Sequence, residues 1–432
     1  MIKISGIIFI LFLFLSCSFH NSGFWTKQEN LDKEKNEFKN VLLKKKIVTQ
    51  EFNKNFNFSI DKLSIKINPS SDLNNNDGYL SFNNKLEKIT KYNFSKIKNY
   101  SLFDPNLIFY NENVIFFDDK GTILNFDKNS KLVWKLNDYN KEDRKSGPLI
   151  TFANSKNILI AADNLAKTYA ININNGKILW SKKNKTSFNS EIKIYDNKFF
   201  VVDTSNNLHS FSTQTGKKNW SFSTEKSFVN SFKKLSIVIK KDIIVFNNSL
   251  GDITALDLND GSLLWQISTQ NSEIFEEIMN LKTSELIENE GSLYFSNNKN
   301  QFFSVDITSG AINWIQNINS EVKPAIVGDL IFTISNDGYL FVINKTNGNI
   351  LRITDAINKI KSNKKDGVYP TGFILNSKNV YVSTDNGRLI VIKIETGKID
   401  KILKIDNSKV SRAFVNNQVM YLIKDNSIVK LN

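Results

Sequence analysis

The sequence predicts an all-β fold, a single β-propeller of about eight four-stranded blades. The first observation behind this prediction is a ten-residue phrase that recurs along the chain: a strand, a polar turn with a glycine, and a second strand. The second observation is the spacing of that glycine, which occurs as Gly176, Gly216, Gly261, Gly310, Gly348 and Gly397. Successive copies are 40, 45, 49, 38 and 49 residues apart. A period of about 40 to 50 residues with four strands in each unit is typical of propellers.

The glycine and a large aromatic ring have separate roles in each unit. Glycine supplies the positive φ of a tight turn. The aspartate at the start of the phrase (Asp127, Asp257 and Asp306 in three copies) is expected to accept backbone N–H bonds there. The ring lies four residues after the glycine, where it is expected to pack against the neighbouring blade and bury about 150–250 Å². Five of the six tryptophans occupy this blade-docking position: Trp134, Trp180, Trp220, Trp265 and Trp314.

The strands follow one another from about residue 86, beginning with a predicted strand over 107–117. The last segment, 419–431, ends where an outer strand should begin. A ring with an unfinished blade leaves exposed sheet edges, so strands from 52–100 are expected to complete the last blade. Residues 52–67 alternate between apolar and polar types, which favours one or two strands there. Because no copy of the phrase is recognisable in this region, seven blades remain the alternative to eight.

The N-terminus has the pattern of an export signal. Residues 4–15 are mostly apolar, which is too short for a span of about 20 residues but fits the core of a signal peptide. Cys17, the single cysteine, follows directly and resembles the lipidated cysteine of bacterial lipoproteins, although Phe14 stands where leucine is preferred. We therefore expect a signal peptide over 1–16, then a lipidated Cys17 and polar tether with at most a short helix over 17–50, and the propeller over 51–432. A plain signal peptide or an uncleaved anchor, in either case with an incidental cysteine, is the alternative.

Composition limits the other classes of function. The net charge is +14, but the lysines are spread along the whole chain, whereas nucleic-acid binding requires a focused basic patch. A single cysteine excludes an intrachain disulfide framework. No composition break marks a second domain beside the propeller.

The Asp-x-x-x-Gly-x-x-x-Trp units resemble the repeats of the quinoprotein, or PQQ-like, propeller family. That family includes quinone-dependent dehydrogenases and BamB-like lipoproteins of outer-membrane protein assembly. The order of signal, tether and one propeller is similar to the BamB-like members, and 272–314 carries the closest match. The resemblance implies a scaffold lipoprotein on the periplasmic side of the outer membrane. It also implies that the scaffold docks the periplasmic repeats of the barrel-insertion pore protein. Ser18, in place of an aspartate after the cysteine, favours the outer membrane over the inner membrane.

An enzyme is the less favoured alternative. A quinone dehydrogenase needs oxygen ligands for a metal and a carboxylate base, and members of the family commonly add a vicinal disulfide. One cysteine cannot form that disulfide, and His20 and His209 lack the spacing of metal ligands. We therefore expect no catalytic residues, no metal and no cofactor. Another envelope propeller that recognises a polymer or a different protein is the second alternative.

The resemblance implies that the partner contacts loops between blades. The first such loop, 223–236, holds a group of candidate contact residues: Phe228, Val229, Phe232 and Lys233. The second, 270–283, holds a similar group: Ile274, Phe275 and Met279. Exposed aromatic residues beside a cation are plausible anchors of an interface. Two other interpretations remain open: the aromatic residues of the first loop begin a buried inner strand, and the second loop is a short helix that covers the propeller.

Overall fold

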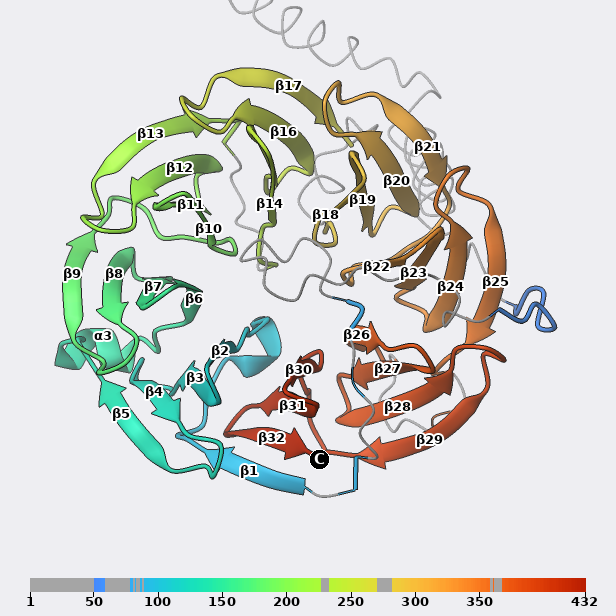
Figure 1. Ribbon diagram of the computed structural model, residues 1–432, viewed down its shortest axis with the longest axis horizontal. Helices are drawn as coiled ribbons and strands as arrows, with labels where there is room; N and C mark the ends of the chain where they lie inside the picture. Colours follow the sequence, from blue (N-terminus) through green and yellow to red (C-terminus); the bar gives the residue numbers. More distant parts are fainter. Residues whose placement is uncertain are drawn as a thin grey trace, which may run out of the picture. The chain divides into compact units, whose positions relative to one another are not determined.

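Eight four-stranded antiparallel sheets surround a central axis in the computed structural model of the protein (Figure 1). The structure describes residues 50–58, 78–80, 82, 86–87, 89–226, 233–269, 282–357, 360 and 367–432. The predicted signal peptide and most of the predicted tether lie outside these described residues. Each blade consists of consecutive strands running from the axis outward, so the sheet order follows the chain order in seven of the eight sheets. The predicted all-β propeller of eight blades is therefore confirmed.

The first four blades occupy the first half of the ring. Blade 1 is β2 (Ile108–Tyr110), β3 (Asn113–Phe117), β4 (Ile123–Phe126) and β5 (Leu132–Leu136). Blade 2 is β6 (Ile150–Ser155), β7 (Ile158–Asp163), β8 (Lys167–Asn172) and β9 (Ile178–Lys183). Blade 3 is β10 (Lys193–Tyr195), β11 (Lys198–Val202), β12 (Asn207–Ser212) and β13 (Lys218–Ser223). Blade 4 is β14 (Ile237–Lys240), β15 (Ile243–Asn247), β16 (Asp252–Asp257) and β17 (Leu263–Ser268).

The other four blades complete the ring. Blade 5 is β18 (Ile287–Asn289), β19 (Ser292–Asn297), β20 (Gln301–Asp306) and β21 (Ile312–Gln316). Blade 6 is β22 (Ala325–Val327), β23 (Leu330–Ile334), β24 (Tyr339–Asn344) and β25 (Ile350–Asp355). Blade 7 is β26 (Pro370–Leu375), β27 (Asn379–Thr384), β28 (Arg388–Lys393) and β29 (Ile399–Lys404). Blade 8 is β30 (Phe414–Asn416), β31 (Val419–Lys424), β32 (Ser427–Leu431) and, outermost, β1 (Ile89–Asn93).

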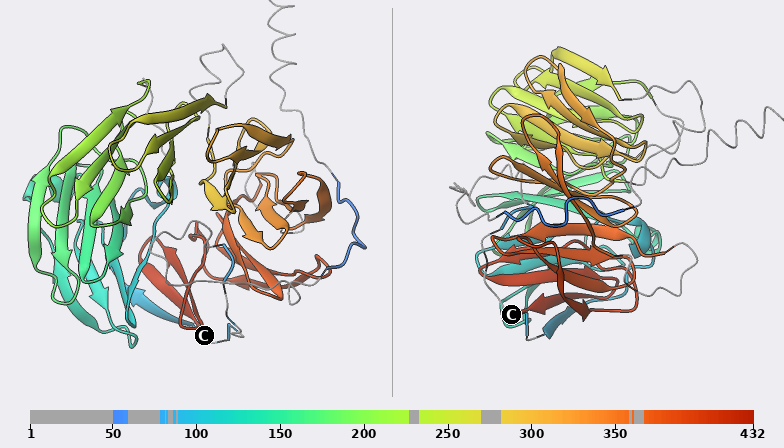
Figure 2. Two further views of the ribbon diagram at one scale, coloured as in Figure 1. Left: turned by 45° about the horizontal axis from the view of Figure 1, so that its top comes forward. Right: turned by 90° about the vertical axis from the view of Figure 1, so that its right-hand side faces the viewer.

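Strand β1 closes the ring. It pairs antiparallel with β32 over its full length, from Ile89 opposite Leu431 to Asn93 opposite Ser427. The N–H of Glu87 also donates to the carbonyl of Asn432, 2.8 Å away. Figure 2 shows the same closure from two further sides, with blue β1 beside red β32. The expectation that the N-terminal region completes the last blade is confirmed, with one strand rather than several.

Two predicted strands differ from the structure. The predicted strand over 107–117 is a hairpin, because Asn111 has a φ of 55° and turns the chain between β2 and β3. The alternation over 52–67 predicted one or two strands, but the described residues 50–58 contain only an isolated bridge between Phe52 and Ile353. The rest of that range lies outside the described residues. Alternation records which side chains are apolar, and it does not record where the chain turns back.

Burial follows the position of each strand in its blade. The second and third strands are nearly all buried, as in β19 and β20, because both of their faces pack against neighbouring blades. The outermost strands alternate between exposed and half-buried residues, as in β21. The described helical elements are short: α3 (Lys141–Lys145) and the 3₁₀ turn η1 (Tyr100–Leu102). None of the described helices is long and apolar enough to cross a membrane.

Candidate functional site

The topology places the two candidate loops at the same end of the ring. In an antiparallel four-stranded blade, the link from the outer strand to the next inner strand leaves from the same end as the turn between the second and third strands. The loop between β13 and β14 and the loop between β17 and β18 are both links of this kind. We call this end the loop face. The described ends of the two links, Lys226 and Lys233 of the first and Thr269 and Lys282 of the second, therefore lie on one face of blades 3 to 5.

Most of the predicted contact residues lie outside the described residues. These are Phe228, Val229 and Phe232 of the first loop, and Ile274, Phe275 and Met279 of the second. The predicted lipidation site, Cys17, lies outside them as well. Lys233 is described, and its ammonium donates to the backbone carbonyl of Glu321 in the link between blades 5 and 6. Lys233 is therefore a bridge across the loop face as well as a candidate contact residue.

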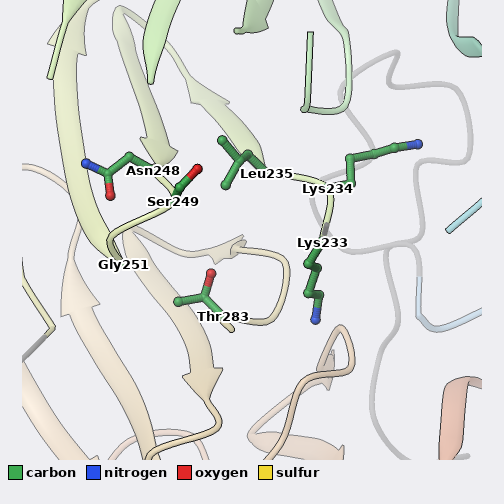
Figure 3. A pocket seen from close by; sticks show the side chains of 7 residues that line it. All are labelled: Lys233, Lys234, Leu235, Asn248, Ser249, Gly251 and Thr283. Carbon is green, nitrogen blue, oxygen red and sulfur yellow. The ribbon is translucent and has the colours of Figure 1, made fainter. Parts of the chain in front are cut away.

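A small pocket lies at the base of both loops (Figure 3). Its lining comes from the first link, the turn between β15 and β16, and the second link: Lys233, Lys234, Leu235, Asn248, Ser249, Gly251 and Thr283. The Asn248 amide donates to the Thr224 hydroxyl at 3.2 Å, and the Asn247 amide donates to the Thr283 hydroxyl at 2.5 Å. Lys234 extends away from Asn248 in this view. The base of the loops is therefore tied together by side-chain amides, while Lys233 and Lys234 extend from the pocket toward groups of other blades, the Glu321 carbonyl and the Phe103 ring.

Charged groups from several blades meet on the loop face. The ammonium of Lys409 lies 3.1 Å from the Asp104 carboxylate, and that of Lys234 lies 5.4 Å from the centre of the Phe103 ring. Loss of hydration opposes the ionised form of Asp104, but the charges of Lys409 and Lys233 outweigh it and hold the pKa of Asp104 below its ordinary value. Burial lowers the pKa of Lys234, and the carboxylates of Asp104 and Glu191 oppose that effect. The loop face therefore carries both signs of charge.

A buried serine joins successive blades beside this cluster. Ser236 donates to the Glu191 carboxylate at 3.0 Å and accepts from the N–H of Leu286 at 3.1 Å. The Glu191 carboxylate also accepts from the N–H of Ile237 at 2.8 Å. Serines at corresponding links are buried as well: Ser190, Ser284, Ser320 and Ser411. Our sequence reasoning missed these serines, although each of them precedes an inner strand and their recurrence was the available signal.

The outer strands are docked by their aromatic residues. The indole N–H of four tryptophans donates to a carbonyl three residues before the next blade's turn glycine, at 2.8–3.1 Å: Trp134 to Ile173, Trp180 to Thr213, Trp265 to Ile307 and Trp314 to Lys345. The ring also covers that glycine, since a Cβ at Gly176 would lie 2.8 Å from Trp134. Blade 6 has Arg352 instead of tryptophan. Its guanidinium donates to the equivalent carbonyl, that of Ile394, at 2.6 Å.

The recurring aspartates are turn residues. Asp127 accepts from the N–H groups of Asn129 and Lys131, both at 2.9 Å, and Asp306 accepts from that of Ser309 at 2.8 Å. Asp203 has a similar role, and its carboxylate lies 2.9 Å from Nε2 of His209. Within the described ranges, no group of three or more His, Cys, Asp or Glu residues is placed to hold a metal ion. Asp127, Asp203 and Asp306 are thus engaged in backbone turns.

Comparison with known proteins identifies a family. A sequence profile described as outer membrane protein assembly factor BamB matches residues 119–354. An uncharacterized protein of Rickettsia prowazekii is 20% identical over 392 residues, which are 85% of this chain and 91% of the relative. The outer membrane protein assembly factor BamB of Legionella pneumophila is 25% identical over 205 residues, which are 45% of this chain and 48% of the relative.

Solved structures share the fold. The crystal structure of BamB from Moraxella catarrhalis has a TM-score of 0.61 at 16% identity and covers 79% of this chain and all of its own. A quinohemoprotein alcohol dehydrogenase from Comamonas testosteroni has a TM-score of 0.61 at 10% identity and covers 82% of this chain and 78% of its own. These similarities establish the fold alone. The sequence profile spans more than half of the 432 residues, and the chain therefore belongs to the BamB family of outer membrane protein assembly factors.

Proposed function

We propose that this protein is a non-catalytic scaffold of outer-membrane protein assembly, anchored in the outer membrane through Cys17 and facing the periplasm. Its partner on this proposal is the barrel-insertion pore protein, whose periplasmic repeats dock on the loop face of blades 3 to 5. The observation that carries the proposal is the family match over 119–354, combined with two long links on one face. A rigid ring that presents such loops fits recognition of another protein.

The chemistry of the described residues supports a scaffold over an enzyme. Asp127, Asp257 and Asp306 accept backbone N–H bonds in turns, where they lie away from the axis on the outer part of their blades. The charged groups at the loop face have partners from neighbouring blades, as in the pair of Lys409 and Asp104. Groups held in this way fix the geometry of a docking face. A quinone that co-purified with stoichiometric calcium would instead support the dehydrogenase reading.

The proposal is tested by variants in the two loops. Phe232→Glu and Phe275→Glu place a charge where an apolar anchor is proposed, and we expect each to reduce co-purification of barrel-assembly subunits from solubilised envelopes at least fivefold. The matched control is Asn259→Glu, an exposed residue in the turn between β16 and β17 at the opposite end of blade 4. Normal recovery of the subunits with both loop variants would remove these loops as the contact. If the subunits never co-purify with the unmodified protein, the proposed function is wrong.

A further inference from the structure

The outer edge of blade 6 is occupied by the protein's own N-terminal residues. Phe52 and Ile353 exchange two backbone hydrogen bonds, each 3.1 Å long. The Asn53 amide donates to the carbonyl of Leu351 at 3.0 Å, and the Glu51 carboxylate accepts from the N–H of Asp355 at 3.2 Å. The segment lies along the outside of β25 in Figure 1. Blade 6 therefore shows how the rim of this ring receives an extended peptide.

Arg352 ties this segment to blades 6 and 7. Its guanidinium donates to the carbonyl of Phe56 at 3.2 Å and lies 4.7 Å from the centre of the Phe58 ring. The same group donates to the carbonyls of Ile394 and Glu395 in blade 7. Arg352 is 1% exposed, so removing the segment would uncover a buried cation. The N-terminal segment is thus part of the blade 6 rim.

The repeat places isoleucine at the same position of three neighbouring blades. Ile315, Ile353 and Ile402 each follow the docking position by one residue. Their strand partners are also equivalent: Ile315 lies opposite Phe303, Ile353 opposite Phe341, and Ile402 opposite Ile390. Their exposures nevertheless differ, at 45% for Ile315, 6% for Ile353 and 44% for Ile402. The covered isoleucine is the one beside the N-terminal segment.

Blade 5 repeats the apolar surface of the blade 6 rim. Ile312 and Ile315 of β21 correspond to Ile350 and Ile353 of β25, and Ile312 is 49% exposed. Within the described part of the chain, no strand pairs with the outer edge of β21. The N–H and C=O of Ile315 therefore point outward from the sheet, as those of Ile353 do toward Phe52. An unpaired apolar edge of this kind is a template for another strand.

We propose that the outer edge of β21 binds an extended, uncharged peptide segment of another protein by antiparallel edge pairing. The backbone of Ile315 pairs with the peptide as Ile353 pairs with Phe52. Successive side chains of the extended peptide alternate between its two faces, so Ile312 and Ile315 contact every second one. The peptide side chains on that face are therefore apolar. Main-chain hydrogen bonds supply the attraction and the two isoleucines supply the selectivity. The occupant of blade 6 supports this chemistry, because Phe52 is itself an aromatic residue in an extended segment.

We place the site on blade 5 because its outer strand differs from that of blade 7. We expect its binding to be reversible because it differs from that of blade 6. On blade 7, Ile402 is flanked by Asp400 and Lys404, and such charges protect an edge from pairing. The corresponding neighbours on blade 5, Asn313 and Asn317, are uncharged. Trp314 replaces Arg352, and its indole N–H already donates to Lys345. A peptide on β21 is therefore held without the guanidinium clasp that fixes the N-terminal segment on blade 6.

The test removes one outward donor and leaves the blade intact. Ile315→Pro deletes the N–H that faces the peptide, and proline is tolerated on an edge strand where the N–H faces solvent. The matched control is Ser221→Pro, at the equivalent position of blade 3, where Ser221 lies opposite His209. The probe is a fluorescein-labelled nonapeptide of alternating threonine and valine with one central phenylalanine, and its anisotropy is measured. We expect at least a tenfold weaker affinity for Ile315→Pro and an unchanged affinity for Ser221→Pro.

Several results would overturn the proposal. Equal affinity of Ile315→Pro and the unmodified protein would do so, and so would an equal loss with Ser221→Pro. Thermal unfolding checks that both variants are folded. If Ile315→Pro is not folded, the double variant Ile312→Thr with Ile315→Thr keeps the donor, and unchanged affinity there also contradicts the proposal. Concentration-dependent self-association that is lost with Ile315→Pro, without peptide binding, would instead assign the edge to a second copy of the chain.

The rim site is independent of the proposed loop-face docking. Phe232→Glu, which is designed to weaken the loop contact, is expected to leave the anisotropy titration unchanged. Conversely, the Ile312→Thr and Ile315→Thr changes are expected to leave co-purification of barrel-assembly subunits unchanged. Failure of one proposal can thus be distinguished from failure of the other.

Discussion

Single residues at the contacts between blades explain where glycine is required. Gly176, Gly216, Gly261, Gly310 and Gly348 each have positive φ and lie under the indole of the preceding blade. Ser130 adopts a φ of 67° at the same position of blade 1. The preceding outer strand there is β1, which carries no tryptophan. Lys401 has no glycine turn to cover, because blade 8 receives its outer strand from the N-terminus.

The first residue-scale prediction separates the cost of positive φ in a turn from the cost of crowding the indole ring. Gly310→Ala and Gly291→Ala both place alanine at positive φ, with φ values of 75° and 87°, at a cost of about 1–2 kcal/mol each. A Cβ at Gly310 would also lie 2.7 Å from Trp265, whereas nothing lies within 4 Å of one at Gly291. Overpacking adds about 1–3 kcal/mol at Gly310. Denaturant unfolding should therefore show the larger loss for Gly310→Ala, and equal losses would contradict the indole contact.

The second residue-scale prediction concerns acid stability. Burial alone would raise the pKa of Asp203, but hydrogen bonds from His209, Asn207 and Thr186 outweigh it and lower the pKa to about 2. The unfolded value is about 3.9, so this carboxylate stabilises the fold fully above that pH, by about 2–3 kcal/mol, and the contribution is lost as the pH falls toward 2. Asp203→Asn should lower the free energy of unfolding at pH 6 and flatten its decline between pH 4 and 2. An unchanged acid slope in denaturant titrations would contradict this role.

Secondary-structure elements divide into those that the sequence pattern locates and those that it misplaces. The glycine phrase located the third and outer strands, because turn chemistry and alternation coincide there, as in β16 and β17. The hairpin at Asn111 was missed, because asparagine adopts positive φ there inside an apolar run. The strand at Ile89–Asn93 was expected only within a broad range, since its pairing with β32 joins the two ends of the chain.

The element-scale prediction concerns ring closure. A chain that begins at Phe94 lacks β1, so blade 8 exposes the edge of β32, and we expect loss of a single cooperative thermal transition and aggregation. A chain that begins at Gly78 keeps β1 and its pairing with β32. Both chains lack the segment that covers β25, so the second chain, which differs in keeping β1, should still unfold in one cooperative transition and aggregate less than the first in sedimentation experiments. A cooperative, monomeric ring from the shorter chain would show that β1 is dispensable for closure.

At the scale of the whole molecule, closure of the ring by both chain ends makes it a rigid support for its loops. Such rigidity suits docking, since a partner then orders only its own contact residues. The candidate contact residues Phe232 and Phe275 were chosen from the sequence, because exposed aromatic residues in long links are typical anchors. Their arrangement on the loop face remains a prediction, whereas the charge pairs around Lys233 emerged only from the structure.

The whole-molecule prediction concerns the anchor. If Cys17 is lipidated, a fatty-acid probe should label the unmodified protein, and Cys17→Ala should lose the label and leave the outer-membrane fraction. Cys17→Ala is expected to keep the thermal unfolding transition of the propeller, because Cys17 precedes the ring unit Gln50–Asn432. Labelling of both proteins, or membrane retention of Cys17→Ala, would contradict a lipid anchor.

The sequence by itself determined the repeat, the turn glycines, the docking tryptophans and hence a propeller with an unfinished last blade. These features depend on neighbours along the chain, and each copy of the phrase records them independently. Only the tertiary structure decided that Ile89–Asn93 completes blade 8, that Arg352 holds the N-terminal segment, and that Ile353 is covered while Ile315 is exposed. Those contacts join residues separated by hundreds of positions. Their partners are set by which edges meet when the ring closes, and no local pattern carries that information.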